Sequence, residues 1–110
     1  MNTDSQQIQA KKMSREMRAV LRIINTDEEL QRKALPHVDI ARESIDWPMI
    51  WANDFGGGHS GALCWAMAIW CDRVATNVRG LDPFDRAFSL DVPLQIAVIE
   101  ALKIRWALVK

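Results

Sequence analysis

The stretch SGALCWAMAIWCDRVATNVR, residues 60–79, decides the expected fold of this chain. One apolar stripe recurs in it at helical spacings of four, three and four: Leu63, Met67, Trp70 and Val74. A second set widens that surface: Ala62, Trp65, Ala66, Ile69 and Arg73. Ser60 is a favourable N-cap, and Gly80 suits the left-handed position just after a helix. The stretch therefore predicts a helix over 60–79 that other helices surround.

Two helices are expected before this one near the amino end. The first runs from about Ser5 to Ile24, with Asp4 or Ser5 as its cap and one apolar stripe: Ala10, Met13, Met17, Val20, Leu21 and Ile24. Asn25 is the expected corner. Thr26 and Glu29 have the spacing of a capping box, so a second helix should begin near Asp27. Pro36 should kink or end it.

Four more helical segments are expected, two before the central stretch and two after it. Residues 37–45 can form one or two helical turns, and Asp46 followed by Pro48 predicts a short helix through about Asn53. After the central helix, residues 81–88 predict another short helix. Asp91 and Pro93 open a strongly apolar last helix over 92–109, which should pack against the central one. No run of four residues alternates apolar with polar, so no strand is expected.

These signals predict an all-α fold. We expect a single helical domain over residues 1–110, folded as an orthogonal or irregular bundle of five to seven helices around the central apolar helix at about 60–79. A chain of 110 residues fits one domain with one core. No window approaches 18 uninterrupted apolar residues, so no membrane span is predicted.

The overall charge excludes no class of partner by itself, because 14 basic side chains balance 14 acidic ones. The charge is uneven, however: residues 1–25 carry a net +3, and residues 26–54 carry a net −4. The start of the sequence lacks a signal-peptide pattern, which favours a cytoplasmic location. Cys64 and Cys71 lie seven apart on one helix, about 10.5 Å, too far for a disulfide. We expect both thiols to be reduced and buried.

The glycine loop Gly56-Gly57-Gly58-His59-Ser60-Gly61 matches the literal G-x-G-x-x-G pattern of dinucleotide sites. Such a site also needs a preceding strand, and residues 47–54 do not read as one. A flexible connection between helices is the plainer interpretation. The amino end of the following helix would still favour an anion, so an anion or nucleotide site at 56–61 stays open as an alternative.

No catalytic, cofactor or metal site is predicted. His59 beside Ser60 invites a nucleophile and base, but adjacent residues rarely aim at one point, and Ser60 has a role as cap. The metal-binding side chains lack the close paired spacing of a zinc site: His37, His59, Cys64 and Cys71. We therefore predict that the protein is not an enzyme.

A basic stripe lies along the predicted first helix: Lys11, Arg15, Arg18 and Arg22. Such a stripe can contact nucleic-acid phosphates or an acidic protein, although a solvated helix face is the favoured interpretation. The chain also has five tryptophans. Trp65 and Trp70 are expected in the core. Trp47 and Trp51 flank the glycine loop and can serve either the core or a partner.

The second half resembles a family of small helical domains of uncharacterised activity, carried by bacterial plasmids and integrative elements. The matching features follow one another in order: Asp54, the glycines and Ser60, then Ala68-Ile69-Trp70, Gly80-Leu81-Asp82 and Phe88-Ser89-Leu90-Asp91. The resemblance implies an accessory protein of a mobile element. It assigns no activity.

The leading hypothesis is a non-enzymatic protein that binds another protein, such as a regulator or a counter-defence inhibitor. The candidate contact residues are Arg15, Arg18, Arg22, Trp47, Trp51 and His59. The alternatives are a nucleic-acid-binding regulator that uses the basic stripe and an anion site at the glycine loop. The apolar last helix, ending at Trp106-Ala-Leu-Val109, also suggests a homo-oligomer.

Overall fold

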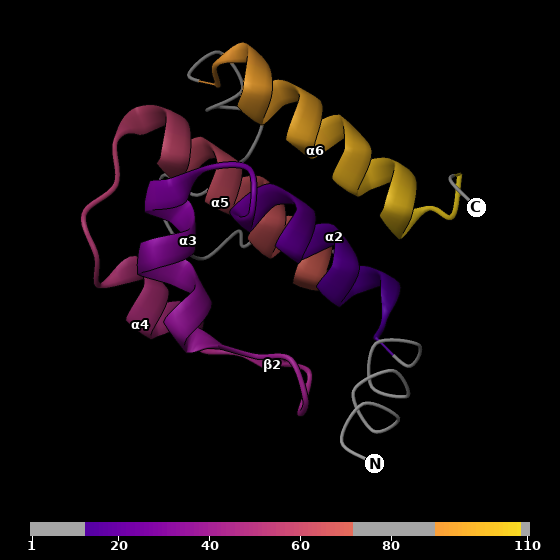
Figure 1. Cartoon of the computed structure of the whole chain (residues 1–110), viewed down its shortest axis with the longest axis horizontal. Helices are drawn as coiled ribbons and strands as arrows, with labels where there is room; N and C mark the ends of the chain where they lie inside the picture. Colours follow the sequence, from indigo (N-terminus) through magenta and orange to yellow (C-terminus); the bar gives the residue numbers. More distant parts are fainter. Residues whose placement is uncertain (1–12, 72–89, 109–110) are drawn as a thin grey trace.

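The computed structural model describes residues 13–71 and 90–108 of the chain (Figure 1). Its elements, in order, are α2 (Arg15–Ile24), α3 (Glu28–Ala34), the 3-10 turn η1 (Leu35–His37), β1 (Val38–Asp39), β2 (Ser44–Ile45), α4 (Trp47–Trp51), α5 (Gly57–Cys71) and α6 (Val92–Arg105). The all-α prediction is confirmed, with one small hairpin added to the helices.

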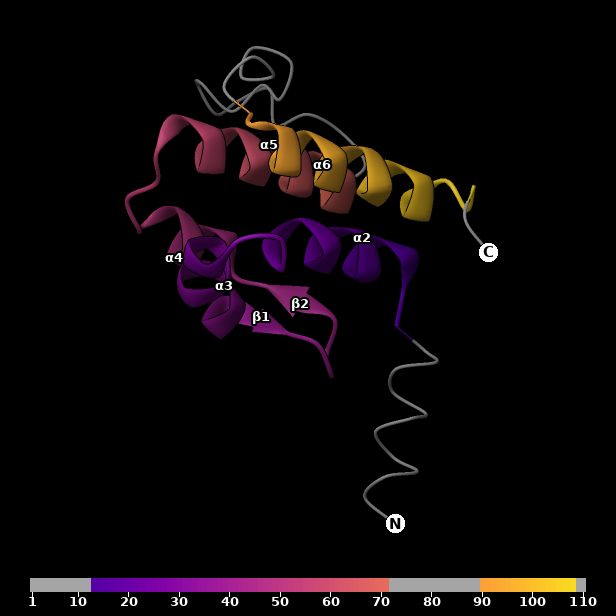
Figure 2. The same ribbon diagram turned by 45° about the horizontal axis from the view of Figure 1, so that its top comes forward.

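Helix α2 packs against more of the described fold than any other helix. Its contacts with α6 and α5 are the most extensive between elements, and it also touches α3. Figure 2 shows α5 and α6 side by side on one side of α2, with α3 and the hairpin on the other. The side chains that α2 buries all lie on one face: Met17, Ala19, Val20, Ile23 and Ile24. The core therefore forms around α2 and the apolar α5.

The start of α2 corrects the predicted first helix. Ser14 has extended backbone, and its side chain accepts a hydrogen bond from the amide of Met17, so α2 begins at Arg15 and does not run continuously from Ser5. The Glu43 carboxylate accepts hydrogen bonds from the Ser14 amide, at 2.8 Å, and from its hydroxyl. Residues 1–12, including the predicted cap and Lys11, lie outside the described residues.

The predicted second helix is confirmed, but its cap is a different residue. Asp27 Oδ2 accepts hydrogen bonds from the amides of Glu29, at 2.9 Å, and Leu30, at 3.1 Å. Thr26 instead donates its hydroxyl to the Arg22 carbonyl, so the capping box is wrong. The helix ends at Ala34, two residues before Pro36, as the missing proline amide requires.

Residues 38–45 form an antiparallel hairpin and not the helical turns expected over 37–45. Val38 pairs with Ile45, and Asp39 pairs with Ser44. The His37 carbonyl accepts a further hydrogen bond from the Asp46 amide, at 2.9 Å. The turn includes Glu43 in the left-handed region, at φ 50°. The bond from Glu43 to Ser14, 29 residues away in sequence, ties this turn to the start of α2.

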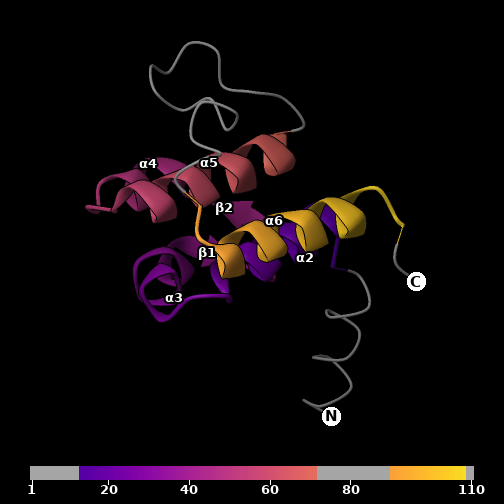
Figure 3. The same cartoon turned by 90° about the horizontal axis from the view of Figure 1, so that it is seen from above.

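Two of the three aspartate caps with a nearby proline are confirmed. The Asp46 side chain accepts from the Met49 amide at the start of α4, and Asp91 does the same for Leu94 at the start of α6. Helix α6 ends at Arg105, four residues before the predicted end. It packs on α5, as expected, and more extensively on α2 (Figure 3). The third such pair, Asp82 and Pro83, predicts the short helix at 81–88 and lies outside the described residues.

The central apolar helix begins three residues earlier than predicted. The Ser60 amide donates to the Gly56 carbonyl at 2.8 Å, so Ser60 lies inside α5 and is not its cap. Gly57 and Gly58 form part of the first turn and not a flexible connection. Seven residues of the helix are buried: Gly61, Ala62, Leu63, Cys64, Ala66, Met67 and Ile69. Its predicted continuation to Gly80, and the short helix at 81–88, lie outside the described residues.

Candidate functional site

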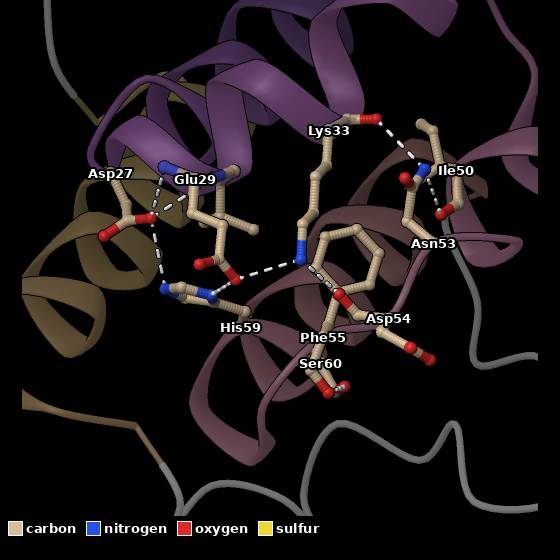
Figure 4. Close-up of polar contacts among 10 residues, drawn as sticks. Asp27, Glu29, Lys33, Ile50, Asn53, Asp54, Phe55, His59 and Ser60 are labelled. Carbon is tan, nitrogen blue, oxygen red and sulfur yellow. Dashed lines mark hydrogen bonds and ion pairs between the residues drawn. The ribbon is translucent and has the colours of Figure 1, made fainter.

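A polar cluster around His59 joins the first turn of α5 to the amino end of α3 (Figure 4). His59 Nε2 lies 3.1 Å from Asp27 Oδ2, and Nδ1 lies 3.1 Å from Glu29 Oε2. The His59 side chain is 22% exposed. Each ring nitrogen thus faces a carboxylate oxygen, and both contacts are hydrogen bonds only when both nitrogens carry a proton. The ring therefore bridges the first turn of α5 and the amino end of α3.

Lys33 extends this cluster toward the segment between α4 and α5. Its ammonium lies 3.2 Å from Glu29 Oε2, donates to the Asp54 carbonyl, and stands 5.3 Å from the centre of the Phe55 ring. One side chain of α3 thereby contacts two residues of the neighbouring segment, Asp54 and Phe55, as well as Glu29 of its own helix (Figure 4). The contact over the ring has the geometry of a cation–π interaction.

The surroundings lower the pKa of both carboxyl groups in the cluster. Partial burial acts to raise the pKa of Asp27, but the Leu30 amide, the charge of His59 and the Glu29 amide outweigh it, so the pKa lies below 3.8. The pKa of Glu29 lies below 4.5, chiefly because Lys33 and then His59 hydrogen-bond to its carboxylate. Both groups are therefore stabilised as anions.

This geometry gives His59 and Ser60 structural contacts. Both nitrogens of His59 face carboxylates, whereas a general base needs one nitrogen directed at the proton it removes. The Ser60 hydroxyl faces the Phe55 carbonyl, at 3.4 Å. Within residues 13–71 and 90–108, no group of three or more side chains could hold a metal ion.

The two candidate tryptophans of α4 turn toward the core. Trp47 and Trp51 are partly buried and pack against the buried cluster. Trp51 also meets Phe55 edge to face, with ring centroids 6.1 Å apart. Their indole nitrogens are buried and have no hydrogen-bond partner among the described residues. Most of their surface therefore serves the fold.

The basic stripe of α2 is only partly directed to solvent. Arg15 and Arg18 are exposed, but Arg22 is half-buried and donates to the Thr26 hydroxyl at 2.8 Å. Lys11 lies outside the described residues. The six candidate contact residues come from three different helices, α2, α4 and α5. Among them, Arg15 and Arg18 present the most accessible charge.

An exposed apolar stripe on α6 was not among the candidate residues. Four of its members are large exposed hydrophobic side chains, and Lys103 lies between them: Val92, Ile96, Ile99, Lys103 and Trp106. The exposed fractions are 64% for Val92, 49% for Ile96, 54% for Ile99 and 63% for Trp106. The face that packs on α2 and α5 is formed by Leu94, Ala97, Val98 and Ala101. Helix α6 is therefore apolar on two opposite faces.

The spacing of this outer stripe was visible in the sequence. Its members follow one another at intervals of four, three, four and three, so they share one face of a helix. The sequence predicted that this strongly apolar helix packs on the central one and suggested a homo-oligomer through it, but the prediction did not separate the two faces. The two apolar faces of α6 can be told apart only when it is known which of them packs on α2.

The cysteines partly follow the prediction. Cys64 is buried and Cys71 is exposed, and no disulfide joins them. The expectation that both are buried is wrong for Cys71, which is the last described residue of α5. A shallow apolar hollow of about 250 Å³ lies between α5 and α6 and is lined by Trp65, Leu90, Gln95, Val98 and Ile99.

No helix in the described part of the chain is both long and apolar enough to cross a membrane. Comparisons with profiles of known protein families, with curated proteins and with solved structures found no match to this chain. The site must therefore be interpreted from its own geometry.

Proposed function

We propose that this protein acts by binding another protein chain through the outer stripe of α6, without catalysis of its own. The stripe carries the proposal because contiguous exposed apolar side chains are uncommon on monomeric proteins and mark interaction surfaces. Burying one large aliphatic side chain is worth about 1.5–3 kcal/mol. The stripe offers three such side chains and the indole of Trp106, a type of residue that often anchors interfaces.

The biological setting of this binding is proposed from the sequence resemblance. An accessory protein of a plasmid or integrative element would act in the cytoplasm as a regulator or as an inhibitor of a host defence protein. A small helical chain with one exposed apolar helix face suits such a role, since helix-in-groove binding needs only anchors at helical spacing.

Photo-crosslinking inside producing cells tests the proposal. A photoreactive amino acid at Ile99 should give covalent adducts with protein, because this side chain lies in the middle of the stripe. The matched control carries the same amino acid at Arg15, which is exposed on α2. Adducts from position 99 that are absent from position 15 are expected. Adducts only from position 15, or none from either, would contradict the proposal.

A second candidate function is nucleic-acid binding through α2, which the exposure of Arg15 and Arg18 supports. Phosphate contacts make such binding weaken steeply with salt. Gel shifts at low and moderate salt should compare the wild type with the triple variant Arg15→Ala, Arg18→Ala and Arg22→Ala. This alternative fails if DNA and RNA binding are the same in both proteins.

A further inference from the structure

We infer that the partner of the α6 stripe is a second copy of this chain, and that the two α6 helices pair antiparallel. This inference rests on the proposed function, since it takes the same stripe as the contact surface. It adds the identity of the partner and the direction of the pairing. Three features of α6 support it: the spacing of the stripe, the position of its charges and the neighbouring hollow.

The spacing of the outer stripe suits pairing with another helix. Intervals of four, three, four and three residues are those of the seam of a coiled coil, whose side chains insert between those of a facing helix. The stripe runs from Val92 to Trp106, which covers about two heptads. Because α6 already packs on α2 and α5 through its opposite face, the seam is available to a helix from outside.

The charges on the seam select the antiparallel direction. In a parallel pair, Lys103 would face Lys103 of the second copy, which is unfavourable between like charges in an apolar seam. In the antiparallel pair, Ile96 lies opposite Ile99 of the second copy, and Val92 lies opposite its Lys103. Asp91 is exposed and next to Val92, so its carboxylate comes near that lysine. The charge arrangement is thus self-complementary.

The hollow between α5 and α6 fits the same register. By residue count, pairing Ile96 with Ile99 of the second copy brings its Trp106 level with position 89, next to Leu90, one of the residues that line the hollow. Trp106 and Gln95 lean to the same side of the seam at 100° per residue. In an antiparallel pair, equivalent sides of the two helices meet. The exposed indole of one copy therefore reaches the apolar hollow of the other.

Sedimentation equilibrium of the full chain, from about 5 μM to about 1 mM, tests for the dimer. This range suits a short seam, which buries less than a standard interface. The average mass should rise from one chain toward two. The double variant Ile96→Ser and Ile99→Ser should stay monomeric, whereas Lys103→Leu should dimerise at least about tenfold more tightly. The matched control, Arg15→Ser and Arg18→Ser, should behave as the wild type.

Two results of that experiment would overturn the inference. A monomeric mass for the wild type at every concentration excludes the dimer. If Ile99 still crosslinks to another protein, the proposed function stands and only the identity of the partner is wrong. If the Ile96 and Ile99 double variant dimerises as well as the wild type, the contact lies elsewhere on the molecule.

Disulfide trapping tests the direction of the pairing in a Cys71→Ser background, where the remaining Cys64 is buried. Val92→Cys together with Lys103→Cys should link two chains under mild oxidation, while each single variant should not. In a parallel pair, positions 92 and 103 would be about 16.5 Å apart along the axis, beyond the roughly 7 Å that a disulfide allows. Links in the single variants would contradict the antiparallel direction, because each can join only equivalent positions of the two chains. A dimer that forms no link in any variant would contradict the register.

Discussion

His59 Nε2 lies 3.1 Å from Asp27 Oδ2, the same oxygen that accepts hydrogen bonds from the amides of Glu29 and Leu30. One carboxylate therefore caps α3 and also anchors the first turn of α5. Gly57 and Gly58 are poor helix formers, each costing about 1 kcal/mol relative to alanine. The contact from His59 helps to explain why the helix nevertheless begins before Ser60.

Replacing His59 by glutamine should destabilise the fold. His59→Gln removes the two ring nitrogens that contact Asp27 and Glu29, and hydrogen bonds to charged groups are worth about 1.5–3 kcal/mol when well shielded. Because both carboxylates are partly exposed, we expect a loss of about 1–2 kcal/mol in the free energy of unfolding. Urea unfolding at pH 7 measures it. His37→Gln is the matched control, and an equal loss in the two variants would contradict the role of the cluster.

The polar cluster around His59 should also make the free energy of unfolding fall at acid pH. The pKa values of Asp27 and Glu29 are lowered in the folded protein, so folding favours their charged forms. Their stabilisation is fully present above their ordinary values of 3.8 and 4.5, and it is lost as pH falls through the lower folded-state values.

Asp27→Asn isolates this effect, because asparagine is as good an N-cap as aspartate but has no charge. The wild type should be the more stable protein at pH 7, and the difference should shrink as pH falls from about 5 to about 3. Chemical unfolding at several pH values measures the difference. Asp54→Asn removes one exposed charge nearby and controls for net charge. A difference that is constant over this range would refute the assignment.

Glu43 should have two opposing effects on the stability of the fold. Its carboxylate binds Ser14, but its φ of 50° is unfavourable for a residue with a side chain. Glu43→Ala loses the contact and keeps the strain, while Glu43→Gly loses the contact and relieves the strain. We expect the glycine variant to be more stable than the alanine variant by about 1 kcal/mol. Thermal unfolding measures this difference.

Ala41→Gly provides the control for that comparison. Ala41 lies in the same turn, and the positive φ values of non-glycine residues in the described chain occur at Glu43 and Ala107. Glycine at position 41 therefore has no strain to relieve, and it should not stabilise the protein. If both glycine substitutions raise the melting temperature equally, the effect belongs to the turn in general and not to Glu43.

Local signals predicted the helix boundaries that depend on a single side chain. Asp46 and Asp91 cap the helices that follow them, and Asn25 ends α2, because these contacts span only a few residues. Local signals failed at the Ser14 cap of α2, which was missed, and at Thr26 and Ser60, which are not caps. The prediction also failed where residues distant in sequence decide. The hairpin has two-residue strands and no glycine or asparagine in its turn, and Glu43 holds it to α2.

The candidate site was only partly predicted, because its contacts also join residues that are distant in sequence. His59 was identified from its neighbours, but its partners lie about 30 residues earlier, and only the fold brings them together. The outer stripe of α6 could have been found from its spacing. Which apolar face of α6 is covered depends on packing against α2, and no local pattern specifies that.

The central claim is that α6 uses one apolar face for the fold and keeps the other for a partner. On the inner face, Leu94 is 3% exposed, and Leu94→Ala should cost about 2–5 kcal/mol. On the outer face, Ile96→Ser and Ile99→Ser replace isoleucine by a residue of similar helix propensity. Exposed substitutions of this kind usually change stability by less than about 0.5 kcal/mol each.

Urea unfolding of the Ile96→Ser and Ile99→Ser double variant tests this claim most directly, at a protein concentration low enough to keep the wild type monomeric. The predicted result is a free energy of unfolding within about 1 kcal/mol of the wild type. A loss of several kcal/mol, comparable to that of Leu94→Ala, would show that the outer stripe is buried in the monomer and would contradict the account.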